Sequence, residues 1–263
     1  MRRKDFIRVL VICCAGFGCA QLQAYGQQDT THVVHGAGEQ LMALANDARA
    51  QTGAGKLQWD ESLATAARAH CLRMADEGPI AHRYGGEDDL STRAGKAGAR
   101  FDLIEENVAV GPSVPAIHDE WMQSPGHRTN LLNAEIDRVG IAVVEAHGVL
   151  YATADYGRGV QALTGLQVEA RVASLVRVSG VTILTDSARA REACGTDRGI
   201  AVAPGEARPG FIMRWQDSAL KELPRPLTEQ LASGQYHRAA VGSCPAQGVE
   251  GDFTAYRVAV LLY

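Results

Sequence analysis

The hydrophobic pattern of this 263-residue chain changes its period partway along, and this change constrains the fold more than any other feature. Apolar side chains recur at helical spacing over Glu39–Gln51, over Asp60–Met74 and over Ser113–Gln123, which predicts three amphipathic helices. Between the second and third helices, Ile80–Phe101 is rich in charges and glycines and is predicted to be a loop.

After the third helix, apolar residues alternate with a period of two over Val139–Val144 and again over Val149–Tyr156. His147 and Gly148 between them suit a turn, so the two stretches predict a β-hairpin. Helices followed by strands with short connections indicate an α+β or a layered α-β-α domain that ends near Gly157.

The last hundred residues show a different pattern, with short apolar stretches separated by turn residues. We therefore expect a small β-rich C-terminal domain over residues 165–263, with one or two helical turns at Leu227–Leu231. The stretches on which this prediction rests are Val172–Val178, Val181–Leu184, Phe211–Trp215 and Tyr256–Tyr263.

The N-terminus has the features of an export signal. A basic start and the apolar run Val9–Ala20 are typical of a secretory signal peptide. The run is too short for a membrane span, which needs about 20 apolar residues. We assign residues 1–24 to the signal and 25–35 to a leader, and expect a secreted protein, periplasmic or extracellular, without a transmembrane span. A short N-terminal anchor is the alternative, and lipidation of Cys19 is a minor one because the usual leucine three residues earlier is missing.

Cysteine usage and charge narrow the possibilities further. Export would leave Cys71, Cys194 and Cys244 in an oxidising compartment. Cys194 and Cys244 lie in the same C-terminal region and are the expected disulfide, whereas Cys71 lies in a helical pattern and is interpreted as a buried, small apolar residue. The formal net charge of -4 provides no basic field for nucleic acid or anionic lipid.

Residues with the chemistry of a site are grouped in three segments. His82 follows the second helix, Glu106 and Asn107 precede the third, and His127 follows it. Neutral imidazoles bind zinc, and a carboxylate can ligate the ion, orient an imidazole or accept a proton. The spacing does not bring these residues together, so a loop histidine, a helix-capping histidine and a Glu-Asn turn remain alternatives.

Several sequence blocks, taken in order, resemble the CAP superfamily, which includes cysteine-rich secretory proteins, antigen 5 and pathogenesis-related proteins. The resemblance covers about residues 36–157 and is strongest to the bacterial branch, in which Ser-Pro-Gly-His-Arg-x-Asn-Leu-Leu is the most specific block. The matching blocks are Asn46–Arg49, Leu57–Asp60, Ala66–His70, Glu106–Ala109, Trp121–Leu132 and Val139–Ala142.

The resemblance implies an α-β-α sandwich with a wide cleft. His82 and His127 match the two cleft histidines of the family, and Glu106 matches the Glu of its Gly-Glu-Asn motif. Two departures reduce the match: Glu105 replaces the glycine of that motif, and no acid stands near Gln123, where eukaryotic members have a second cleft glutamate. The resemblance therefore supports two histidines and one acid of a two-His, two-Glu site.

Three functions remain open on this basis. The first is a non-catalytic module that binds a small or lipid ligand, or a divalent metal such as zinc, through a His-His-Glu cleft. The second is a metal-assisted hydrolase of the peptidase class, although no serine or cysteine nucleophile has a recognisable setting. The third is a structural envelope or extracellular interaction protein. His70, His118 and His147 are interpreted as core or turn residues.

Overall fold

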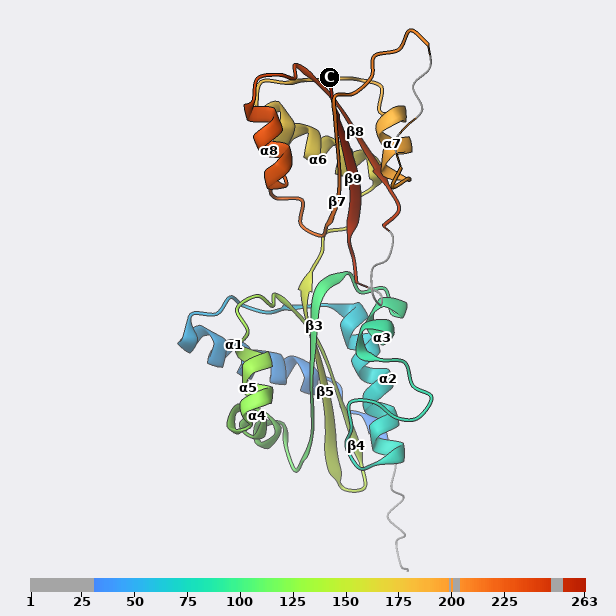
Figure 1. Cartoon of the computed structure of the whole chain (residues 1–263). Helices are drawn as coiled ribbons and strands as arrows, with labels where there is room; N and C mark the ends of the chain where they lie inside the picture. Colours follow the sequence, from blue (N-terminus) through green and yellow to red (C-terminus); the bar gives the residue numbers. More distant parts are fainter. Residues whose placement is uncertain (1–30, 199, 201–203, 247–252) are drawn as a thin grey trace, which may run out of the picture.

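The computed structural model describes residues 31–198, 200, 204–246 and 253–263, which form two domains joined near residue 160 (Figure 1). The predicted signal peptide over residues 1–24, with Cys19, lies outside the described residues. None of the helices that the structure describes is long and apolar enough to cross a membrane.

The first domain is built on a five-stranded sheet. Its main path runs β1-β4-β5-β3 with antiparallel neighbours, and β2 pairs in parallel with β4. The predicted hairpin is β4 and β5, and β1 lies within the stretch expected to be a leader. The strands are β1 (His32–Val33), β2 (Gln58–Trp59), β3 (Phe101–Gly111), β4 (Arg138–Ala146) and β5 (Val149–Gly159).

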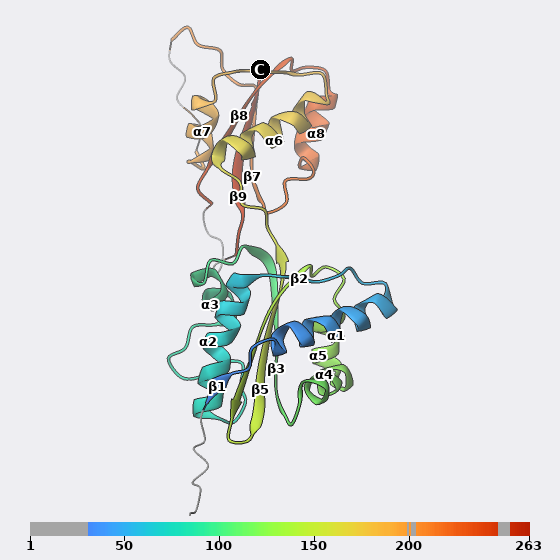
Figure 2. The ribbon, with the colours of Figure 1, turned by 180° about the vertical axis from the view of Figure 1, so that it is seen from behind.

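Helices cover both faces of this sheet, which confirms the predicted sandwich. On one face lie α1 (Ala37–Thr52), α4 (Val114–Gln123) and α5 (Pro125–Leu132), and on the other lie α2 (Glu61–Glu77) and α3 (Leu90–Lys96). The view from behind in Figure 2 also shows α1 and α2 on opposite sides of the sheet. The predicted loop over residues 80–101 was partly wrong, because it contains α3, whose 7 residues are too few to give a clear period.

Two sets of contacts hold α2 and α5 in place. Gly140 lies under α2, where a Cβ atom would come within 1.9 Å of the backbone nitrogen of Ala64, so the helix packs directly on the sheet. On the other face, the buried guanidinium of Arg49 donates to the carbonyls of Leu131 at 2.9 Å and Ile136 at 2.8 Å. Arg49 therefore satisfies carbonyls at and just beyond the end of α5 that the helix itself leaves unpaired.

The second domain has a four-stranded sheet in the order β6-β8-β9-β7, together with three helices in the part of it that the structure describes. The apolar stretch Val172–Val178 lies mostly in a helix rather than a strand, because Val168, Val172 and Val176 are four residues apart and face one core. The elements are α6 (Gly165–Arg177), β6 (Thr182–Ile183), α7 (Ala188–Cys194), β7 (Phe211–Asp217), α8 (Arg225–Ala232), β8 (Arg238–Cys244) and β9 (Tyr256–Leu262).

The disulfide between Cys194 and Cys244 is confirmed, and it joins the end of α7 to the end of β8. Cys71 is a free, buried cysteine on α2, as predicted. The domains meet where Phe253 packs edge-on against Phe101, with ring centroids 5.3 Å apart.

Candidate functional site

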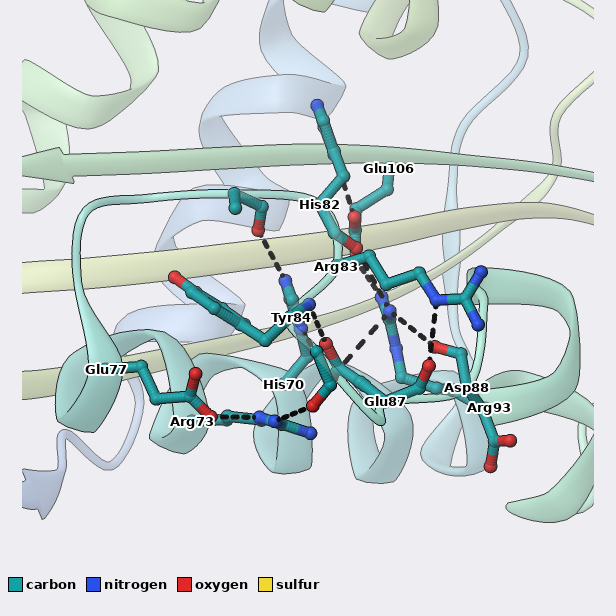
Figure 3. A network of polar contacts seen from close by, with 12 residues as sticks. His70, Arg73, Glu77, His82, Arg83, Tyr84, Glu87, Asp88, Arg93 and Glu106 are labelled. Carbon is teal, nitrogen blue, oxygen red and sulfur yellow. Dashed lines mark hydrogen bonds and ion pairs between the residues drawn. The ribbon is translucent and has the colours of Figure 1, made fainter.

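His82 lies between α2 and α3 and is held by Glu106 on β3. The Nδ1 atom of His82 lies 2.8 Å from Oε1 of Glu106, and the two side chains are 61% and 3% exposed. Because a carboxylate accepts, Nδ1 carries the hydrogen, and Nε2 has no partner among the described residues. In Figure 3 the far end of the ring points away from the network below it. The hydrogen bond to Glu106 raises the pKa of His82, although partial burial and Arg93 oppose this effect.

Arg93 on α3 holds the second carboxylate oxygen of Glu106. The guanidinium is 7% exposed, makes a short contact with Oε2 of Glu106, and donates to the carbonyl of His82 at 3.1 Å. Both oxygens of Glu106 are thus engaged by cationic or polar donors. Glu106 therefore orients the His82 ring and is poorly placed to act as a free ligand.

A second acid lies beneath Glu106. Asp155 on β5 is the register partner of Glu106, is fully buried, and has no hydrogen-bond partner of ordinary geometry for either oxygen among the described residues. Burial raises the pKa of Asp155 well above its usual range, and the negative charge of Glu106 adds to this. Burial therefore favours the neutral form of Asp155 next to the carboxylate of Glu106.

His127 approaches the same edge of the sheet from the opposite face. Asn107 donates to the carbonyl of His127 at 2.9 Å, and Asn130 donates to Oδ1 of Asn107 at 3.0 Å and to the carbonyl of Glu106 at 3.2 Å. Asn107 therefore ties α5 to β3 and sets the backbone of His127.

His82 acts electrostatically on His127. Burial lowers the pKa of His127, and the positive charge of His82 lowers it further. Nδ1 of His127 is buried and lacks a hydrogen-bond partner in the part of the chain that the structure describes. Since β3 is the edge strand, His82 on the α3 side and His127 on the α5 side flank one edge of the sheet.

Three residues of this arrangement escaped the sequence analysis: Glu87, Arg93 and Asp155. Asp155 left one signal, a charged residue within a predicted strand that is otherwise mostly apolar. His70 was expected in the core and is fully buried, but it also contacts Glu87 and belongs to the same polar network. No sequence pattern pointed to Glu87 or Arg93, because the residues with which they pair become neighbours only in the folded chain.

Other features compete less well for a functional role. Burial raises the pKa of Cys71 to about 12, so its thiol is not activated as a nucleophile. A cavity of about 640 Å³ between the domains lies away from both histidines, and its wall includes Asp102 and Arg158, which are paired with each other. No group of three or more His, Cys, Asp or Glu residues within the described ranges is arranged to hold a metal ion.

Comparison with known proteins finds similarity over the first domain. Residues 42–156 match the family model of CAP, the cysteine-rich secretory protein family. The uncharacterized protein YkwD of Bacillus subtilis (strain 168) is 31% identical over 115 residues, which are 42% of this chain and 44% of that protein. This chain thus spans less than half the length of that relative.

Two solved structures are similar in part. An outer surface protein from Borrelia burgdorferi is 20% identical with a TM-score of 0.46, over 49% of this chain and 99% of that one. An extracellular protein containing an SCP domain from Bacillus anthracis is 28% identical with a TM-score of 0.43, over 47% of this chain and 40% of that one.

Proposed function

Because residues 42–156 form a CAP domain, we propose that the protein is a secreted, non-catalytic module that binds a divalent metal ion, Zn²⁺ foremost, between His82 and His127. The single observation that carries the proposal is the His82 ring, which Glu106 holds through Nδ1 at 2.8 Å while Nε2 stays free. A carboxylate that fixes one ring nitrogen so that the other can bind a metal is a recurrent arrangement around metal-ligating histidines.

The donor chemistry fits such an ion. Zn²⁺ takes neutral imidazole nitrogens, and the lowered pKa of His127 keeps that ring neutral near pH 7. Two protein ligands leave the remaining coordination positions to water or to a small ligand. An ion held in this way would be bound less tightly than in a closed four-ligand structural site.

The acids of the site favour binding over catalysis. Metal-assisted hydrolysis needs a base close to the attacking water. Glu106 has both oxygens engaged, and Asp155 is buried with its neutral form favoured, so neither is placed to accept a proton from water in the cleft. Secretion is supported separately by the disulfide, which is stable in oxidising compartments, and by the signal-like N-terminus.

Metal-dependent thermal stability tests this function. Zn²⁺ at 100 times its Kd would stabilise the wild type by about 2.7 kcal/mol, and we expect this gain to disappear in His82→Ala and in His127→Ala. His147→Ala is the matched control, because His147 lies in the turn between β4 and β5 and should leave the gain intact. The proposal fails if Zn²⁺, Mn²⁺, Co²⁺, Ni²⁺ and Ca²⁺ all leave the wild-type Tm unchanged. Peptide hydrolysis that depends on His82 and His127 would instead favour the hydrolase.

A further inference from the structure

The segment that carries His82 has no regular secondary structure, yet it is firmly tied to the helices beneath it. Residues 78–89, here called the His82 segment, connect α2 to α3 without forming a helix or a strand. Fixing the backbone of one residue costs about 1–2 kcal/mol of conformational entropy. In a segment without helix or strand hydrogen bonds, contacts with side chains have to offset this cost. The contacts that hold the His82 segment therefore decide how well the His82 ring is placed.

His70 on α2 holds the carbonyl that precedes His82. Its ring is fully buried, with Nε2 2.9 Å from the carbonyl oxygen of Ala81 and Nδ1 2.7 Å from Oε1 of Glu87. A carbonyl only accepts, so Nε2 is the donor in the first contact. Nδ1 faces a carboxylate, so both ring nitrogens are engaged by oxygen atoms.

Arg93 on α3 holds the next carbonyl along the chain. Its guanidinium donates to the carbonyl of His82 at 3.1 Å and lies 3.8 Å from Oε1 of Glu87. Two successive carbonyls, those of Ala81 and His82, are thus held by two buried side chains from different helices. Glu87 contacts both of these side chains (Figure 3).

Glu87 is the centre of this arrangement. Its side chain is 8% exposed, and its second oxygen accepts from the backbone N–H of Tyr84 at 2.9 Å. Burial tends to raise the pKa of Glu87, but the hydrogen bonds from His70 and Tyr84 outweigh it and leave the pKa lowered. The carboxylate therefore stays ionised and keeps both ends of the His82 segment in contact with the helices.

We propose that His70 and Glu87 are positioning residues for the binding site: together with Arg93 they clamp the backbone on both sides of the Ala81–His82 peptide, so that the His82 ring meets Glu106 before any ligand arrives. Each member of the row His70, Glu87, Arg93 and Glu106 contacts the next. The expected effect on Zn²⁺ affinity rests on the proposed metal function, whereas the placement of the His82 ring is a property of the metal-free protein.

Substitution of Glu87 tests this role without touching a metal-binding residue. Glu87→Gln keeps the size of the side chain but removes its negative charge. We expect about a 10-fold loss of Zn²⁺ affinity by calorimetry, the lower end of the 10–100-fold effect of removing residues that orient metal ligands. We also expect a changed ¹⁵N signal for the His82 ring in the metal-free protein, because its Nδ1–H bond to Glu106 is no longer fixed.

The control is Glu77→Gln, which removes an exposed acid of α2 that pairs with Arg73. It should leave both the affinity and the His82 signal unchanged. Glu87→Asp, which restores the charge, should recover part of the affinity. If Glu87→Gln does not fold by circular dichroism, His70→Gln replaces it under the same criteria, because its amide can still donate to the carbonyl of Ala81.

The two proposals fail differently. Wild-type protein that binds no Zn²⁺ but loses the His82 ring signal in Glu87→Gln would end the metal function and support the positioning role. A Glu87→Gln protein that keeps the wild-type His82 signal and, where Zn²⁺ binds, the wild-type affinity would overturn the positioning role, even if its Tm fell.

Discussion

Removal of Arg93 should expose how the charge of Glu106 is balanced. Arg93→Met keeps a long unbranched side chain but takes the guanidinium away from a carboxylate that is 3% exposed. His82 then remains as its only strong donor among the described residues, and the neighbouring acid Asp155 offers no positive charge. Removing one partner of a buried ion pair costs about 3–5 kcal/mol, so the free energy of unfolding of the first domain should fall by about that amount at pH 7.

Equilibrium urea unfolding followed by tryptophan fluorescence measures this loss. Trp59 and Trp121 lie in the first domain and Trp215 in the second, so a loss confined to the first domain is separable from a global one. The matched variant Arg93→Met with Glu106→Gln removes both charges. It should recover most of the loss, because no uncompensated charge stays buried.

Two results would refute this reasoning. One is a loss below about 1 kcal/mol for Arg93→Met, the range of solvent-exposed ion pairs. The other is a double variant no more stable than the single one, since this would mean that packing of the Arg93 side chain, rather than the charge of Glu106, accounts for the effect.

Three further predictions concern the rest of the chain. Burial raises the pKa of Asp155 above 3.8, so the stability that its protonated form contributes is fully present below about pH 4 and is lost as the pH rises. Asp155→Asn should therefore gain stability relative to the wild type from about pH 4 to pH 8 in urea unfolding, and a constant difference between the two proteins would contradict this. The double variant Cys194→Ala with Cys244→Ala, which opens a link across 50 residues, should cost the second domain about 4 kcal/mol by the loop-entropy estimate, and a calorimetric loss under about 1 kcal/mol would argue against it. Gly140→Ala should cost at least about 3 kcal/mol in the same measurement, because the new Cβ meets Ala64 at 1.9 Å; wild-type stability would mean that α2 yields readily.

The parts of the fold that the sequence predicts are those in which burial follows a simple period. Helices α1, α2 and α4 and the β4–β5 hairpin each bury one face, so their apolar residues repeat at 3.6 or 2. The strand β3 has no such pattern, because its inward positions include the polar Glu106 and Asn107. A short apolar run such as Val172–Val178 fits a helix and a strand equally well, and only the contacts with the second sheet decide between them.

The site divides in the same way. The resemblance pointed to His82, Glu106 and His127, but it did not provide the contacts that make His82 usable. Those contacts come from Arg93 and Glu87, and they exist only because the fold buries both side chains next to their partners. In the sequence these two residues are charged positions without any pattern. Polar residues of this kind resemble solvated surface residues until the fold places an opposite charge beside them.

The charge balance of the finished site limits what it can bind. Arg93 pairs with Glu106, and burial favours the neutral form of Asp155, so neither acid next to the histidines offers an uncompensated negative charge. A second ionised acid, as in a two-His, two-Glu site, would have offset part of the charge of a divalent ion, and here the additional acid beside Glu106 is buried with its pKa raised. An ion bound between the histidines, as proposed, would therefore retain most of its positive charge. Such a centre would favour an anionic group, a carboxylate or a phosphate, in its open coordination positions, and the proposed ion would then join this domain to an acidic ligand.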